Sequence, residues 1–237
     1  MVAGDADFSY RYGALSYSDA VPFGSNGAIF KFRDDQKGSF ITSAPHIFKH
    51  DVPYLEFEPI QFHFHSGVMH SNPANMGSEH TYNGKHFDLE LHIVHFNKNK
   101  TKESQDFLLA AVIGVMFKAS DTTELTYADK FLRNLFSGEP VDTERDFIDH
   151  LNLIHRFVYR GSLTTPKYSE TLLWNMCARI AHINFETLKL FRHNVALLGG
   201  KGQKIFGMPN RDVQDKNGRK VFEIIEGKQP HDDEQSK

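Results

Sequence analysis

Three histidines in the sequence have the spacing of a metal site. His63 and His65 are two residues apart, and His92 follows one predicted hairpin later. A catalytic zinc ion is usually held by three protein ligands in a tetrahedron whose fourth position stays open for water. Three neutral imidazoles leave the full charge of the ion to act on that water. The pattern therefore predicts chemistry in which activated water attacks a small substrate.

Two predicted strands bring these histidines together. Residues 56–66 alternate apolar and polar side chains around QFHFH, the period-two pattern of a strand with two unlike faces, so both histidines of the pair lie on one face. Residues 87–96 form a second such strand, in which Glu90 and His92 share a face. A hairpin between the two strands is expected to place all three histidines side by side.

Each predicted ligand strand also carries a polar neighbour: Gln61 precedes His63 by two residues, and Glu90 precedes His92 by two. Such neighbours fix the imidazole tautomer that leaves the other ring nitrogen for a metal. Without a metal, the same histidines would be hydrogen-bonded residues on a polar sheet face, and the His-x-His pair alone does not separate these interpretations. Structural hydrogen-bonding roles are expected for four other histidines, His70, His80, His86 and His95.

The other predicted elements are strands that join the same sheet and a few short helices. The apolar run at 107–117 indicates a central strand covered on both faces. The remaining expected elements are strands at 28–32 and 172–183, helices at 131–136 and from Asp142 onward, and a helix capped by Asn184.

Length and composition restrict the class of protein. The 237 residues fit one domain, expected at 1–226, followed by a polar and disordered tail at 227–237. The net charge of -3 and the absence of a lysine or arginine run argue against nucleic acid as a partner. No run of 18 apolar residues is present, so no membrane span is expected. The single cysteine, Cys177, forms no internal disulfide, which favours a reducing, cytoplasmic location.

Four separated motifs in this sequence resemble the signature blocks of the α-class carbonic anhydrases, in their order and near their usual separations. The motifs are QFHFHSG at 61–67, GSEHT at 77–81, ELHIVHFN at 90–97 and GSLTTP at 161–166. The resemblance covers nearly the whole chain. It implies a mainly β (α+β) single domain, built on a large, mostly antiparallel, twisted central sheet with a few short peripheral helices.

The resemblance also implies a reaction: the reversible hydration of carbon dioxide to bicarbonate and a proton by zinc-bound hydroxide. One Zn²⁺ per chain would be held by His63, His65 and His92, with Gln61 and Glu90 orienting these ligands. Carbon dioxide, bicarbonate and water would be the partners of the site, and protein partners are not indicated.

Further roles follow from the same resemblance. Thr164 would accept the proton of the hydroxide and donate its own proton to Glu79, so that a lone pair faces the substrate. An apolar wall for carbon dioxide, together with Thr165, would line the site. The wall residues implied are Val94, Val112, Leu163, Leu172 and Trp174. Apart from the motifs, these apolar residues would be read as core packing.

The sequence departs from the family pattern at three places. The amino-terminal segment of the family, with its aromatic cluster and a motif ending in Ser-Pro, is expected to be missing. Ser66 stands where a tryptophan usually follows the second ligand. Ala28 stands where fast members of the family carry a proton-shuttling histidine, so the shuttle is expected to be absent.

Two alternative functions remain open. A cupin-like metal enzyme also uses a His-x-His pair and a later histidine, but it normally adds a carboxylate ligand soon after the pair, and here no acid follows before Glu79. A metal analysis would separate zinc from iron or manganese. A catalytically weak carbonic-anhydrase-related binding module is the second alternative, and an assay of carbon dioxide hydration on zinc-loaded protein would test it.

Overall fold

The structure is a computed structural model of the chain. It describes residues 14–15, 20–23, 27–32, 40–42, 55–66, 77–98, 108–137, 140–198 and 210–225. The position of the expected tail at 227–237 lies outside the described residues. No helix within the described ranges is long and apolar enough to cross a membrane.

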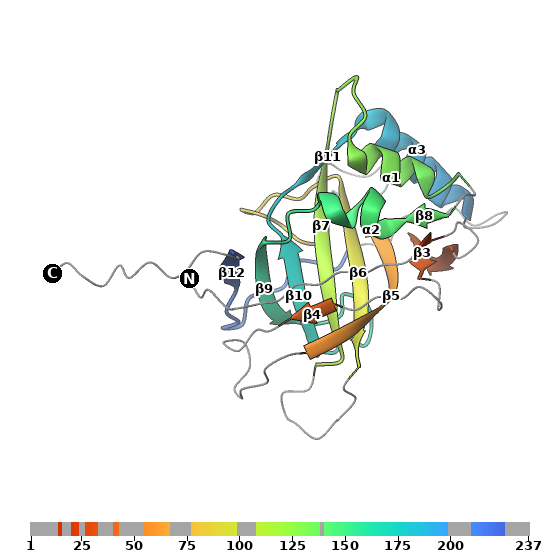
Figure 1. The fold of residues 1–237 in the computed structure, drawn as a ribbon. Coiled ribbons are helices and arrows are strands. Elements are labelled where there is room, and N and C mark those ends of the chain that lie inside the picture. The colour runs from red at the N-terminus through yellow and green to blue at the C-terminus, as the bar shows by residue number, and fades with distance from the viewer. Residues whose placement is uncertain are drawn as a thin grey trace.

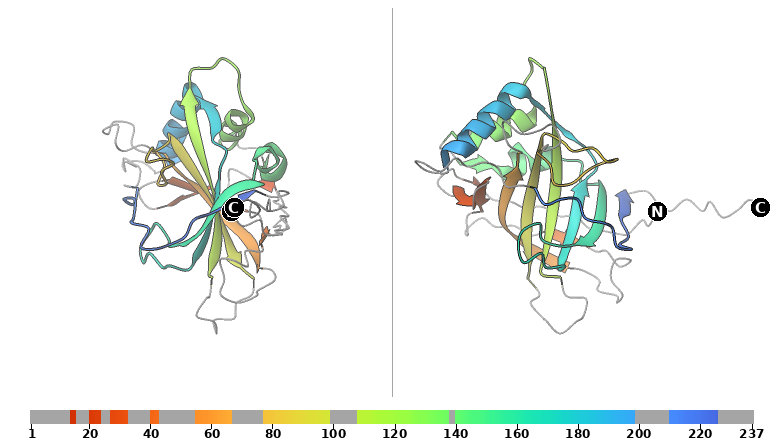
Figure 2. Two further views of the ribbon diagram at one scale, coloured as in Figure 1. Left: turned by 90° about the vertical axis from the view of Figure 1, so that its left-hand side faces the viewer. Right: turned by 180° about the vertical axis from the view of Figure 1, so that it is seen from behind.

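One large twisted sheet forms the body of the molecule (Figures 1 and 2). Eight of its strands follow the order β12-β9-β10-β7-β6-β5-β3-β2, and within the described residues β4 also pairs with β5 and β11 with β7. The strands are β2 Ala20–Phe23, β3 Gly27–Lys31, β4 Phe40–Thr42, β5 Leu55–His65, β6 Leu89–Asn97, β7 Ala110–Ser120, β9 His155–Gly161, β10 Leu172–Cys177, β11 Ala181–Asn184 and β12 Phe222–Ile225. A separate small pair joins β1 Ala14–Leu15 to β8 Val141–Asp142.

Most strand pairs are antiparallel, and only β10 and β11 run parallel to β7 among the described pairs. The helices α1 Tyr127–Asn134, α2 Thr143–Asp146 and α3 Phe185–Leu198 and the 3₁₀ helix Ile148–His150 lie at the periphery of the sheet (Figure 1). The expected mainly β class, with a large sheet and a few peripheral helices, is confirmed.

Two expected elements need correction. The predicted strand at 172–183 is two strands, because β10 and β11 both pair with β7 and the chain between them carries two residues more than β7 does. The predicted helix from Asp142 starts there, with its side chain accepting a bond from Arg145 N at 3.1 Å. It ends after one turn, because Phe147 leaves helical geometry to stack on Phe131 with ring centroids 4.4 Å apart. The strands β9 and β12 were not predicted.

The main core lies on the face of the sheet that the helices cover. Phe62 and Phe64 of β5, Ile93 of β6 and Val115 of β7 are buried there against Phe131 of α1. Their alternation leaves the intervening residues of the same strands on the opposite face. Period two therefore places the polar residues of β5 and β6 together, away from the helices.

A β-bulge between Pro59 and Gln61 shifts the register of β5 against β6. Phe57, which precedes the bulge, lies opposite Asn97, and Phe62 beyond it lies opposite Ile93, so the two rings share one face of the sheet although they are five residues apart. An extra residue at a bulge reverses the face on which the following side chains lie. The bulge thus sets the face of the histidines that follow in β5.

The buried His95 predicts a pH dependence of stability. It lies on the core face of β6, with Nδ1 3.3 Å from the carbonyl oxygen of Ala111, and burial lowers its pKa from 6.5 to about 3. Between these pH values the unfolded chain binds a proton at His95 that the folded chain does not. The free energy of unfolding is therefore expected to decrease as the pH is lowered through this window, by up to about 1.4 kcal/mol per pH unit from this residue.

Urea unfolding of the metal-free protein at a series of pH values would measure this slope. His95→Gln keeps a hydrogen-bonding group but no imidazole, so its slope in the same window is expected to be shallower. An equal slope in both proteins would contradict the assignment to His95.

Candidate metal centre

The pairing of β5 with β6 brings the three predicted ligands together. In the antiparallel register His63 lies opposite His92, and His65 lies opposite Glu90. The ring centroids of His63 and His65 are each within 5.2 Å of that of His92. One potential ligand atom from each of the three histidines lies within 4.8 Å of the others.

A polar side chain engages one ring nitrogen of each histidine. Gln61 Oε1 lies 3.1 Å from Nδ1 of His63, and Glu90 Oε1 lies 2.7 Å from Nε2 of His92. The side chain of Asn210 hydrogen-bonds His65. The bonds of Gln61 and Glu90 are those that the sequence predicted, and a metal bound here would be held through Nε2 of His63 and Nδ1 of His92.

The two histidines of β5 are held neutral. Burial, followed by the proximity of His92, lowers the pKa of His65 to about 3. Burial likewise lowers the pKa of His63 well below its usual value, with His92 and His65 adding to the effect. Neutral imidazole is the form that binds a metal ion, so at neutral pH His63 and His65 need no deprotonation before binding.

The donor set fits zinc. His65 Nε2 is buried and has no hydrogen-bond partner among the described residues, although buried polar atoms normally have one. A metal ion bound by this atom and the two other imidazoles would satisfy it. Three imidazole donors, each oriented through its other nitrogen, are the arrangement of a catalytic zinc site with one open position.

Glu90 anchors the site through bonds to both of its oxygens. It is fully buried; Oε2 accepts from the backbone nitrogens of Glu79 at 2.8 Å and His80 at 2.9 Å. Oε1 lies 2.6 Å from His80 Nδ1 as well as 2.7 Å from His92 Nε2. Burial opposes ionisation, but these two histidines hold the pKa of Glu90 well below its usual range. Glu90 therefore stays a carboxylate that fixes the orientation of His92.

His80 and Tyr159 extend this network, and the role of Tyr159 was not predicted. The hydroxyl of Tyr159 lies 2.6 Å from Nε2 of His80. Burial raises the pKa of Tyr159 well above its usual value, so its hydroxyl stays protonated and can donate. His80 has the structural hydrogen-bonding role that the sequence predicted for it. The position of His80 in the GSEHT motif was the only sequence signal for this network. Tyr159 lies far from that motif in the sequence, so no local pattern indicated its contact with His80.

Gly114 of β7, directly opposite His92 in the sheet, is a second contributor that the sequence did not reveal. A Cβ atom there would lie 2.3 Å from the sulfur of Met176 and 3.6 Å from Oε1 of Glu90. The Met176 side chain would have to shift to admit such an atom, whereas the distance to Glu90 is an ordinary van der Waals contact. Glycine at this position therefore lets Met176 pack directly beside the ligand strand.

Glu79 lies beside the metal centre, but the predicted bond from Thr164 is not formed. Its Oε1 accepts from the backbone nitrogen of Arg211 at 3.1 Å, and its Oε2 lies 3.4 Å from His65 Nε2. Within the described part of the chain, Oε2 has no hydrogen-bond partner. Thr164 and Glu79 line the same pocket. The role of this pair stays a prediction.

The five predicted wall residues belong to one apolar cluster. Val112, Leu172 and Trp174 are buried in it, and Val94 and Leu163 pack against it. The Trp174 ring lies 4.7 Å from that of His92 between centroids, so the wall adjoins the metal ligands. Thr165 follows in the same loop and accepts a backbone bond from Tyr168 at 2.8 Å.

Ala28, the position of the expected missing shuttle, lies in β3 opposite Pro22, and the next residue, Ile29, lies opposite His63. The backbone of position 28 is thus close to the ligand strand. Its side chain lies outside the described part of the structure.

Comparison with known proteins matches the chain to one family. The family model of eukaryotic-type carbonic anhydrases matches residues 17–225. Carbonic anhydrase 6 of Canis lupus familiaris is 33% identical over 178 residues, which are 70% of this chain and 53% of that protein. Alpha carbonic anhydrase 4 of Arabidopsis thaliana is 31% identical over 179 residues, which are 73% of this chain and 57% of that protein. The chain spans little more than half the length of these curated relatives.

Solved structures share the fold. The halotolerant carbonic anhydrase of Dunaliella salina superposes with a TM-score of 0.64 at 23% identity, over 89% of this chain and 73% of that one. The α-carbonic anhydrase of Thermovibrio ammonificans, solved with the inhibitor sulfanilamide, superposes with a TM-score of 0.58 at 26% identity, over 93% of this chain and 80% of that one. Since the match of the family model runs through all four motifs and every strand of the metal centre, the chain belongs to the eukaryotic-type, or α-class, carbonic anhydrase family.

Proposed function

We propose that the protein is a zinc enzyme that hydrates carbon dioxide reversibly to bicarbonate and a proton. The observation that carries this proposal is the cluster of three histidines, in which His63 and His65 are held neutral and His65 has a buried nitrogen without a hydrogen-bond partner in the described structure. Zinc, when bound, would act as a Lewis acid that lowers the pKa of a water molecule to about 7 and makes hydroxide available at neutral pH.

The protein's own residues would bind and position the substrate. Carbon dioxide carries no charge, so the apolar cluster around Val112, Leu172 and Trp174 would hold it loosely beside the metal centre. Thr164 Oγ1 would accept a hydrogen bond from the attacking oxygen and donate its own proton to Glu79 Oε2. That carboxylate oxygen is buried and has no hydrogen-bond partner among the described residues, which supports this assignment.

Stopped-flow measurement of carbon dioxide hydration tests the proposal directly. Zinc-loaded protein is expected to accelerate the reaction, and the same protein after removal of zinc by a chelator is expected to lose the acceleration. Zinc-loaded, folded protein with no activity above buffer would favour the alternative of a binding module. Iron or manganese as the resident metal would instead favour a different enzyme class.

The role of Thr164 leads to a separate prediction. Thr164→Ala is expected to retain zinc but to lose about 2 kcal/mol or more of transition-state stabilisation, roughly a thirtyfold fall in kcat/KM, because one preorganised hydrogen bond is removed. Thr164→Ser keeps the hydroxyl and is expected to recover most of the activity. Metal content and kcat/KM should be measured on the same preparations. Unchanged activity in the alanine variant would exclude the orienting role.

A further inference from the structure

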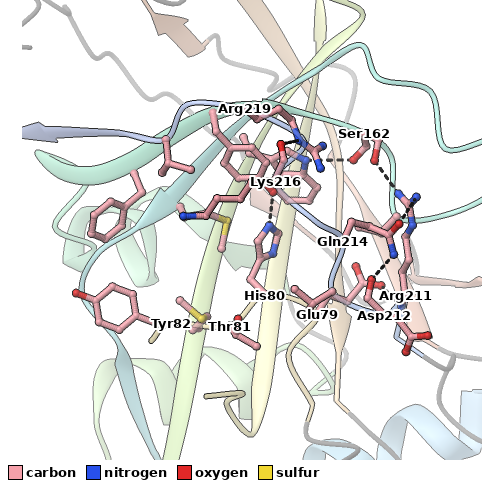
Figure 3. Close-up of a pocket in the computed structure, with 18 residues that line it drawn as sticks. Glu79, His80, Thr81, Tyr82, Ser162, Arg211, Asp212, Gln214, Lys216 and Arg219 are labelled. Carbon is pink, nitrogen blue, oxygen red and sulfur yellow. Dashed lines mark hydrogen bonds between the residues drawn. The ribbon is translucent and has the colours of Figure 1, made fainter. Parts of the chain in front are cut away.

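A pocket of about 400 Å³ opens on the same face of the sheet as the metal centre. Its lining is drawn in Figure 3, and Glu79, Thr164 and Trp174 of the proposed catalytic site are part of it. Its apolar walls include Met116 of β7, Phe157 and Tyr159 of β9, and Trp174 and Met176 of β10. Within the described residues, none of the three metal ligands lines it. The volume falls in the range of about 300–1,000 Å³ that is usual for small-molecule sites.

Trp174 lies between this pocket and the metal centre. Its ring lines the pocket and also lies 4.7 Å from the His92 ring between centroids. Val94, Val112, Leu163 and Leu172, which form the predicted wall for carbon dioxide, do not line the pocket within the described residues. A molecule bound in the pocket would therefore contact aromatic rings without occupying the predicted substrate position.

Three cations border the pocket: Arg211, Lys216 and Arg219. The guanidinium of Arg211 donates to Ser162 Oγ at 2.7 Å, and that of Arg219 donates to the carbonyl oxygen of Asp215 at 2.7 Å. Among the described residues, none of the three forms an ion pair with a carboxylate. These partners are neutral, so the positive charge at the border is not neutralised by ion pairing.

Two carboxylates also line the pocket, Asp212 and Glu79. Glu79 is buried and its Oε2 faces His65, on the side of the metal centre. The three cations therefore outnumber the acid at the border. Aromatic and thioether walls favour a flat apolar ring, and the cationic border favours an anionic group at one end of it.

We infer that this pocket is a second ligand site, separate from the metal centre, that binds a small aromatic carboxylate. The ring lies among Phe157, Tyr159 and Trp174, and the carboxylate lies towards Lys216 and Arg219. The inference goes beyond the proposed carbon dioxide hydration: none of the three histidines of the metal centre lines the pocket within the described residues, although Glu79, Thr164 and Trp174 border both sites.

The chain's one tryptophan makes the site measurable, because Trp174 is both a wall of the pocket and the sole indole fluorophore. 4-Nitrobenzoate quenches indole fluorescence on contact, and 4-nitrobenzyl alcohol has the same ring without the charge. Titrations of the zinc-loaded protein, corrected for absorption with N-acetyltryptophanamide, are expected to show saturable quenching by the carboxylate. The carboxylate is expected to bind about tenfold more tightly than the alcohol.

Lys216 and Lys220 give a matched pair of variants on one segment. Both are exposed, but only Lys216 lines the pocket. Lys216→Glu is expected to weaken 4-nitrobenzoate binding about fivefold or more and to leave the alcohol unaffected. Lys220→Glu makes the same change of charge but is expected to change the affinity for 4-nitrobenzoate by less than about twofold, because solvent screens the more distant charge. If Lys216→Glu does not fold by circular dichroism, Lys216→Gln tests the same loss of charge.

Removal of zinc separates this site from the metal centre. The affinity for 4-nitrobenzoate is expected to be the same in zinc-loaded and metal-free protein. If 4-nitrobenzoate bound to the metal instead, its affinity would be lost when the zinc is removed, and that result would overturn the inference. Quenching that does not saturate, or equal effects of the two lysine variants, would overturn it as well.

Discussion

His92→Ala is expected to abolish both zinc binding and carbon dioxide hydration. The wild-type protein should bind about one zinc ion per chain, and the variant should lose more than about 100-fold in zinc affinity, because loss of a partner that merely orients a ligand already costs about 10- to 100-fold. Metal content after dialysis, measured by mass spectrometry, and stopped-flow hydration on the same samples would check this.

The fold is expected to survive this change. Glu90 Oε1 keeps its bond to His80, and both backbone donors to Oε2 remain, so the buried carboxylate is not left without partners. His92 itself is 1% exposed, and its loss leaves a small cavity of the kind that lowers stability by about 2 kcal/mol or more. Far-UV circular dichroism and urea unfolding of metal-free samples would separate a loss of metal from a loss of folding.

Two further variants serve as controls. Glu90→Gln keeps the ligand but weakens its orientation, and is expected to lower zinc affinity by about 10- to 100-fold. His182→Ala removes an exposed histidine of β11, distant in sequence from all three ligands, and is expected to keep both zinc and activity. Full zinc occupancy in His92→Ala would show that the ligand assignment is wrong.

The sequence was sufficient to predict the ligand strands because their chemistry is periodic. Alternation places His63 and His65 on the same face of β5, and Glu90 and His92 on the same face of β6. The pairing of the two strands brings these residues together on one face of the sheet. The polar neighbours Gln61 and Glu90 were predictable for the same reason. Side chains two residues apart on a strand share a face wherever the strand lies in the sheet.

The remainder of the site depends on contacts between segments distant in sequence. Tyr159 reaches His80, Asn210 reaches His65, and Gly114 makes room beside His92. None of these contacts has a local pattern, because each follows from the order of strands in the sheet. The break between β10 and β11 has a similar origin: pairing with the long β7, rather than the propensity of residues 172–183, decides where each strand ends.

Ala28 leads to the last prediction, which concerns the rate. Hydration of carbon dioxide releases one proton per turnover, and that proton must reach bulk solvent before the next. Direct transfer to water from a group with a pKa near 7 is limited to roughly 10⁴ per second, against about 10⁶ per second for the fastest chemistry of this kind. A histidine near the opening of the site relieves this limit, since its pKa of about 6.5 lets it accept and release the proton with little bias.

Alanine has no titratable group, and position 28 lies next in sequence to the residue that pairs with His63 in the sheet. We therefore expect the maximal rate to rise with the concentration of imidazole buffer, while kcat/KM for carbon dioxide stays constant. Ala28→His is expected to raise kcat at low buffer concentration by up to about 100-fold, the ratio of the two limits, and to weaken the dependence on buffer. Ala28→Gln, which adds a polar side chain without a titratable group, is the matched control and should leave both kcat and its dependence on buffer unchanged.

His46 and His50, which lie outside the described residues, are the alternative carriers of the proton. A wild-type rate near 10⁶ per second that does not respond to buffer would show that one of them, or another group, already performs the transfer.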